Sequence, residues 1–184
     1  MNLSYFYLLV FALISWWLAS INGWNESDRT QAPAHSADYF SKGYTKWEMS
    51  PSGLLKSQVF ADQMLHYSDD GTTHMTKPVM YSLDAKNPPW VIKSETGVLS
   101  ADSKSLLLNG KVNLERAKNQ QVKALTINTS NLKVNPETSY AETNQWAELI
   151  SPPNRTTGVG MKLVYAQPIH LELLSQVKGK YETK

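Results

Sequence analysis

Few side chains in this sequence have the types and spacing that metal binding requires. The four histidines occur in neither of the patterns, His-x-His and His-Glu-x-x-His, that bring two ligands to one metal ion. The chain also has no cysteine, which excludes thiolate ligands, thiol chemistry and disulfide bonds. We therefore predict no metal site and no cofactor.

Nucleophilic catalysis is poorly supported as well. Residues 130–133 and 175–178 both read Ser-x-x-Lys, but the partner motifs of penicillin-binding enzymes are missing. Residues three apart in a strand point to opposite faces, so such a lysine is badly placed to activate the serine. The sequence also lacks Gly-x-Ser-x-Gly and a phosphate-binding glycine loop. We predict that the protein is not an enzyme.

The charge of the chain excludes a further class of function. The formal net charge is only +2, and the lysines and arginines are scattered along the sequence. A surface that follows a phosphate backbone needs clustered basic residues. Nucleic-acid binding is therefore not expected.

An uncharged apolar segment at residues 3–21 determines the expected location of the protein. As a helix its 19 residues span roughly 29 Å, close to the thickness of the hydrocarbon core of a bilayer. Trp16, Trp17 and Trp24 gather near its end, where aromatic rings favour the headgroup level. The alternative is a cleaved signal peptide. We favour an uncleaved transmembrane anchor, because no lysine or arginine precedes the segment, the apolar run is long for a signal peptide, and Trp-Trp-Leu-Ala-Ser at residues 16–20 is a poor cleavage site.

Three regions are predicted from these patterns. Residues 1–24 form the anchor, residues 25–38 form a polar periplasmic linker, and residues 39–184 form one domain. In the third region apolar residues recur with a period of two, and turn signals separate the runs. Such runs are residues 44–49, 55–67, 79–83, 106–114, 125–134, 146–150, 161–165 and 169–173.

This pattern predicts an all-β fold, an antiparallel sandwich or roll. Asn109-Gly110 fits either a tight hairpin turn or a bulged glycine inside one strand. We prefer the bulge, because the alternation keeps its phase from Leu106 to Leu114.

The domain is rich in large or adaptable apolar side chains. At least half of them are expected to form ordinary core. The others are consistent with a roll whose interior is lined but not filled, and which accepts an apolar ligand. The set comprises Trp47, Met49, Phe60, Met64, Met75, Met80, Tyr81, Trp90, Trp146, Met161, Tyr165 and Tyr181.

Several short motifs follow one another in a recognisable order. They are Pro51-Ser52-Gly53-Leu54, Ala61-Asp62, Lys77-Pro78-Val79, Pro89-Trp90, Leu108-x-Gly110-x-Val112, Gly158-x-Gly160-Met161 and Val177-x-Gly179-x-Tyr181. Together with the anchor and the tether, this order resembles the LptC family of lipopolysaccharide export proteins. The resemblance covers essentially the whole chain.

The resemblance implies an open antiparallel β-jellyroll with a hydrophobic groove, held in the inner membrane by one transmembrane helix. Such a protein receives lipopolysaccharide from the LptB–LptF–LptG transporter and passes it to periplasmic LptA, without hydrolysing anything. The alternative is a membrane-anchored periplasmic β scaffold with a solid core and no lipid cargo.

The resemblance also implies roles for individual residues. The lipid groove is expected to contain Tyr44, Trp47, Met75, Leu171 and Tyr181. The N-terminal edge, near residues 39–49, is expected to meet the transporter, as is the helix. The C-terminal edge, near residues 171–181 and including Leu173 and Val177, is expected to meet LptA. Gly53 and Gly158 are expected at turns, and weak homodimer formation through an exposed edge is left open.

Because a carrier must release its lipid, the groove is expected to be apolar and without charges that fix the ligand.

Overall fold

The computed structural model describes residues 3–22, 35–84 and 87–181. Their contacts separate two units, Met1–His35 and Ser36–Lys184. The first contains helix α1, Leu3–Asn22. Its described side chains are almost all apolar and exposed. Within the described residues, no helix meets the length and hydropathy needed to cross a membrane. Trp24 and most of the predicted linker lie outside the described residues.

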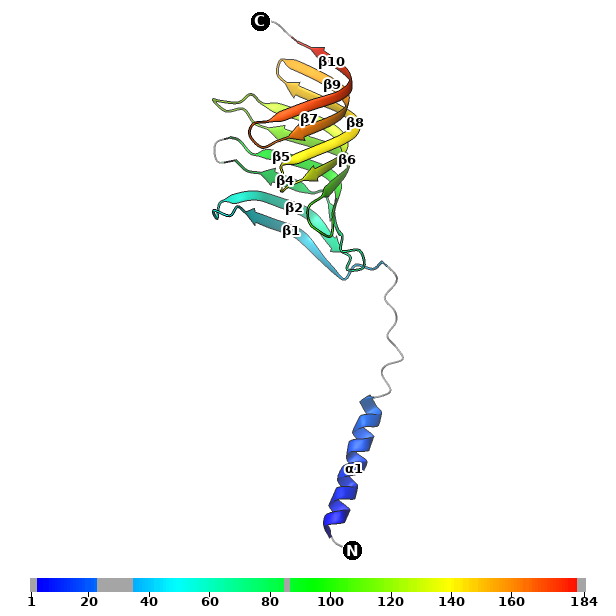
Figure 1. Ribbon diagram of the computed structural model, residues 1–184. Helices are drawn as coiled ribbons and strands as arrows, with labels where there is room; N and C mark the ends of the chain where they lie inside the picture. Colours follow the sequence, from blue (N-terminus) through cyan, green and yellow to red (C-terminus); the bar gives the residue numbers. More distant parts are fainter. Residues whose placement is uncertain (1–2, 23–34, 85–86, 182–184) are drawn as a thin grey trace. The chain divides into compact units, whose positions relative to one another are not determined.

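The second unit is built from one antiparallel sheet (Figure 1). Ten strands lie in its described part, and consecutive strands pair with one another except β3 and β4, so the chain runs as a meander. The prediction of an all-β antiparallel fold is confirmed. The strands are β1 (Tyr39–Met49), β2 (Leu55–His66), β3 (Thr73–Thr76), β4 (Val79–Ser82), β5 (Trp90–Leu99), β6 (Leu106–Arg116), β7 (Leu125–Asn135), β8 (Tyr140–Ser151), β9 (Asn154–Val164) and β10 (His170–Lys180).

Strands β3 and β4 together occupy one position in the sheet, between β2 and β5. The break between them falls at Lys77 and Pro78, where Lys77 has a positive φ of 48°. Proline has no N–H to give to a ladder, so it is suited to such an interruption.

A row of bulges crosses the sheet from β5 to β10. The pairing register shifts at every step along this row, and φ is positive at Gly110, Asn131, Gly160 and Gln176. Bulges bend a strand and increase its twist. Each long strand therefore bends near its middle, and the inner faces of its two halves share one core. The preferred interpretation of Gly110, a bulged glycine within continuous β6, is confirmed.

The core is tightly filled over most of its length. Several of its side chains, from β6 to β9, have no exposed surface: Leu114, Ile127, Leu132, Val134, Ala141, Met161 and Leu163. Filling of this kind is typical of protein interiors. The expectation of a roll whose interior is lined but not filled is therefore wrong for this part of the sheet.

Candidate functional site

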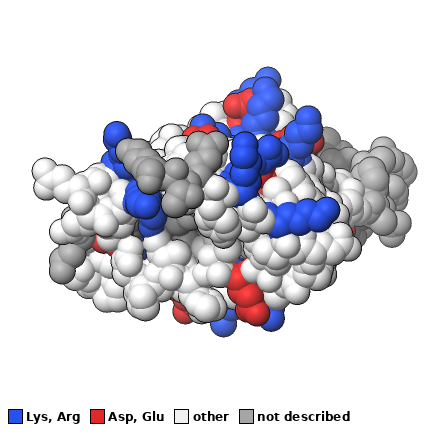
Figure 2. Space-filling view, turned by 90° about the horizontal axis from the view of Figure 1, so that it is seen from above, with Lys and Arg blue, Asp and Glu red and all other residues white. Residues whose placement is uncertain are grey.

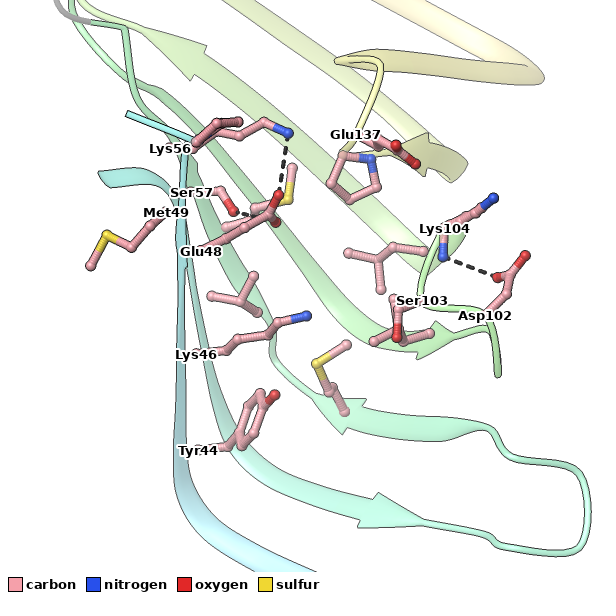
Figure 3. A pocket seen from close by; sticks show the side chains of 17 residues that line it. Tyr44, Lys46, Glu48, Met49, Lys56, Ser57, Asp102, Ser103, Lys104 and Glu137 are labelled. Atoms are coloured by element: carbon pink, nitrogen blue, oxygen red, sulfur yellow. Dashed lines mark hydrogen bonds and ion pairs between the residues drawn. The ribbon is translucent and has the colours of Figure 1, made fainter. Parts of the chain in front are cut away.

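A cavity of about 420 Å³ lies at the β1 end of the sheet. Strands β1 and β2 form one wall, and the segment Asp102–Lys104 with Pro136 and Glu137 forms the other (Figure 3). Its volume falls within the range of small-molecule sites, about 300–1,000 Å³. This cavity is therefore formed by the N-terminal strands of the sheet together with residues of the β5–β6 and β7–β8 connections.

The floor of this cavity is apolar. Met75 and Met80 are buried beneath it, and Val59, Leu99 and Leu106 complete its apolar surface. Thioethers are soft and flexible, so such a surface adapts to chains of different shape. Among the predicted groove residues, the structure brings Tyr44 and Met75 together here.

The wall contributed by β1 is polar. Tyr44, Lys46 and Glu48 alternate along the strand and pair with Ala61, Val59 and Ser57 on the inner face of β2. Burial, and to a smaller extent the neighbouring Tyr39, raises the pKa of Tyr44 above its ordinary value. In Figure 3 the Lys46 amine projects into the space between the walls.

Glu48 makes two polar contacts with side chains of β2. Lys56 Nζ lies 3.2 Å from its Oε1, and the Ser57 hydroxyl donates to its Oε2 at 3.1 Å. Burial, the largest cause, and the negative charge of Glu48 raise the pKa of Tyr165 well above its ordinary range, and a hydrogen bond with Ser139 acts in the opposite direction. Tyr165 directly follows β9.

The expectation of a groove without charges is therefore wrong at this end. Lys46, Lys56 and Lys104 line the cavity together with Glu48, Asp102 and Glu137. The period of two along β1 already placed Lys46 and Glu48 on the same face as Tyr44, and this signal could have revealed them. Because these lysines are matched by an equal number of carboxylates, the polar part of the cavity lining carries no large net charge.

Trp47 does not lie in this cavity. It alternates with Lys46 and Glu48 along β1, which places it on the outer face of the sheet, and 57% of its surface is exposed. The prediction that it lines the groove is thus wrong, because the phase of the strand directs it away from the interior.

The predicted residues of β10 lie apart from the cavity. Leu171 and Leu173 are half-buried against the core, where they pair with Leu163 and Met161. Val177 and Tyr181 are exposed near the end of the chain. Within the described residues β10 pairs only with β9, so this strand forms an edge of the sheet, as β1 does at the opposite end.

The two glycines expected at turns lie in different kinds of local structure. Gly53 does lie in the β1–β2 turn, with φ of 79° and its N–H bonded to Ser50 O at 2.9 Å. Gly158 lies inside β9, and its expected position at a turn is wrong. A Cβ atom there would approach Leu173 Cβ to 3.1 Å, so the glycine permits close approach of β10.

Figure 2 shows lysine and arginine side chains at several places on one face of the molecule, with acidic side chains among them.

Polar side chains of neighbouring strands contact one another on the outer face of the sheet. Arg155 forms an ion pair with the nearly buried carboxylate of Glu148, which also accepts a hydrogen bond from Asn128 at 3.0 Å. Asn128 accepts in turn from Asn113, at 3.0 Å. These groups form a chain of hydrogen bonds and one ion pair across the outer face of the sheet, in which each group has a partner.

Comparison with known proteins agrees with this architecture. The chain is 25% identical over 179 residues to the lipopolysaccharide export system protein LptC of Escherichia coli K12 and to that of Shigella flexneri, covering 95% of this chain and 92% of each relative. The crystal structure of LptH from Pseudomonas aeruginosa, an LptA-homologous periplasmic component of the lipopolysaccharide transport device, superimposes with a TM-score of 0.54. That match has 10% identity and covers 69% of this chain and 95% of LptH, which shows a shared fold. Residues 6–182 match the family described as lipopolysaccharide-assembly, LptC-related. The chain therefore belongs to the LptC family.

Proposed function

We propose that this protein is a non-enzymatic component of the lipopolysaccharide transport bridge and that it holds acyl chains of its cargo in the cavity beside β1. Membership of the LptC family and the LptA-like fold support a role in lipopolysaccharide transport. The observation that carries the finer proposal is the 420 Å³ cavity with its methionine floor.

The physics of acyl-chain transfer suits this cavity. Shielding each methylene from water is worth roughly 0.8 kcal/mol, so exposing a chain of about a dozen carbons costs on the order of 10 kcal/mol. Met75, Met80 and Val59 offer apolar surface for such a chain. The polar groups of β1 lie at the side of the same cavity, where they suit the polar part of an amphiphile. The proposed lipid groove is therefore limited to this cavity.

The edges of the sheet support the proposed partners. We place the LptB–LptF–LptG transporter, which supplies the lipid, at the edge of β1, and LptA, which accepts it, at the edge of β10. Both strands have one side without a strand partner among the described residues. Unpaired amides and carbonyls along such edges can receive a strand from another protein.

We propose further that α1 anchors the protein in the inner membrane, with residues 39–184 in the periplasm. The uncharged sequence of residues 3–21 supports this location, as do the exposed apolar side chains of the helix. Retention of the full chain in the membrane pellet after an alkaline carbonate wash is the expected result. Release of the chain into the supernatant would contradict the anchor.

Site-specific photo-crosslinking tests the cavity. A photoreactive amino acid at Met75 or Tyr44 should capture lipopolysaccharide while the transporter hydrolyses ATP. Trp47 provides a matched control, because it lies on β1 but on the outer face. Equal capture from all three positions, or capture from position 47 alone, would contradict the proposal.

One observation favours the alternative of a scaffold without cargo. The interior between β6 and β9 is filled with side chains, and Leu114 and Ile127 have no exposed surface. If the protein is such a scaffold, the Met75 position captures no lipid, yet the transporter and LptA still copurify with it.

A further inference from the structure

Arg116 is an unusual residue for the interior of a β sheet. It is the last residue of β6 and lies on the inner face, in alternation with the buried Val112 and Leu114. Only 9% of its surface is exposed. Its neighbours in the ladder are Trp90 on β5 and Leu125 on β7.

The contacts of its guanidinium satisfy only part of its hydrogen-bonding capacity. The Arg116 Cζ atom lies 5.1 Å from the centre of the Trp90 ring, a cation–π contact. One N–H group, on Nη2, donates to Lys123 O at 3.3 Å. Nε and Nη1 are buried, and among the described residues neither has a hydrogen-bond partner.

This arrangement leaves a positive charge without a counter-ion. Within the described residues no carboxylate forms an ion pair with Arg116. Burial lowers the pKa of its guanidinium, but arginine remains protonated at neutral pH. Buried charges in proteins are normally paired, because an uncompensated one is costly. The vacant donors therefore point to a missing anionic partner.

The adjoining loop has the charge that such a partner requires. Residues 117–124 connect β6 to β7 and contain Lys118 and Lys123, and no acidic residue occurs between Glu115 and Glu137. The loop is held by its own hydrogen bonds: Asn119 Oδ1 accepts from the N–H groups of Gln121 and Val122, both at 2.8 Å.

We propose that Arg116 and the loop of residues 117–124 form a binding site for a phosphate-type oxyanion, to which the unpaired Nε–H of Arg116 donates. Hydrogen bonds from a guanidinium to phosphate oxygens are charge-assisted and stronger than neutral ones. The oxyanion is either free phosphate or the phosphate of a lipid headgroup. Neither Arg116 nor the loop lines the cavity of Figure 3, so this site goes beyond the proposed lipid cavity.

The side-chain Nε–H signals of arginine in ¹⁵N NMR spectra offer a direct test. The chain has three arginines, so the full-length protein in neutral dodecyl maltoside micelles gives three such signals. Arg29→Lys and Arg155→Lys identify the Arg116 signal by elimination. Titration with inorganic phosphate, against sodium chloride of equal ionic strength, tests the free anion. Dodecyl phosphate added to the micelles tests the lipid headgroup.

A saturable shift of the Arg116 signal in either titration supports the site. A response to inorganic phosphate identifies the free anion as sufficient, and a response to dodecyl phosphate alone identifies the headgroup. No response to either phosphate would overturn the proposal, whatever the crosslinking at Met75 shows.

The contribution of the guanidinium is measured with Arg116→Gln, using the backbone N–H signal of Val122 as the reporter. We expect about tenfold weaker phosphate binding, in line with loss of charged hydrogen bonds. Arg155→Gln is the matched control and should bind as the unchanged protein does. Equal affinity of Arg116→Gln and the unchanged protein would contradict the assignment. If Arg116→Gln does not fold, the titration of the unchanged protein still decides.

Discussion

At the scale of single residues, the buried phenol of Tyr165 links stability to pH. Burial raises the pKa of Tyr165 well above the value of about 10 in an unfolded chain. The folded state therefore holds this proton more tightly than the unfolded state does. The resulting stabilisation is fully present below pH 10 and is lost as the pH rises further.

The free energy of unfolding of Tyr165→Phe should accordingly depend less on pH in the alkaline range than that of the unchanged protein. Above about pH 10, the free energy of unfolding of the unchanged protein should fall by up to roughly 1.4 kcal/mol per pH unit more than that of the variant. Urea unfolding between pH 9 and pH 11.5 measures both slopes, with Tyr181→Phe as an exposed control. Identical slopes for Tyr165→Phe and the unchanged protein would refute the assignment.

Leu114 and Leu107 on β6 separate the contribution of the core from that of the surface. Leu114 has no exposed surface, whereas Leu107 is 41% exposed. We expect Leu114→Ala to lower the free energy of unfolding by about 3 kcal/mol, because it removes buried methyl groups and leaves a cavity. Leu107→Ala should cost less than about 1 kcal/mol. Denaturant melts of both variants check the comparison, and equal losses would show that β6 does not face a packed interior.

At the scale of elements, the row of bulges determines how the sheet bends. Gly110 has φ of 76°, a conformation that costs residues with a Cβ atom about 1–2 kcal/mol. Gly110→Ala should therefore lower stability by about that amount, whereas Asn109→Ala, its neighbour, should change it by less. Thermal unfolding followed by circular dichroism measures both. A neutral Gly110→Ala variant would mean that β6 runs straight through this position.

The strand pattern could be predicted from sequence far better than the contents of the interior. Alternation from Leu106 to Leu114 identified the buried face of β6, and it held across the bulge at Gly110. The alternation along β1 also places Trp47 on the outer face, opposite to Lys46 and Glu48, so the prediction that Trp47 lines the groove departed from this pattern. Whether the space between distant halves of the sheet is filled depends on side-chain volumes from several strands. A period of two along one strand carries no information about whether this space is filled.

For Arg116, too, the sequence predicts the position of the side chain but not its surroundings. Its place in the series Val112, Leu114, Arg116 predicts an inward position, but nothing in the sequence shows that its donors lack acceptors. That fact emerges only when β5, β6 and β7 are paired and Trp90 lies beneath the guanidinium.

At the scale of the whole sheet, the two terminal strands differ in character. The inner face of β1 carries Tyr44, Lys46 and Glu48, whereas β10 exposes Leu174 and Val177. The meander keeps these strands at opposite ends of one ladder. This difference in chemistry is consistent with the two different partners proposed above. A partner at each edge would be joined through unlike surfaces, in a heterologous contact, so the assembly would extend the sheet in one direction.

Proline substitutions at each edge test whether the partners use separate strands. Proline removes a backbone N–H and is tolerated mainly at sheet edges, so it should weaken strand addition more than folding. We expect Val177→Pro to reduce copurification of LptA and to leave LptB–LptF–LptG bound, and Thr45→Pro to have the reverse effect. Each variant serves as the control for the other, and thermal melts confirm that both fold. If either substitution released both partners equally, or neither, the two edges would not be independent docking strands, and the direction of transfer along the sheet would need another physical basis.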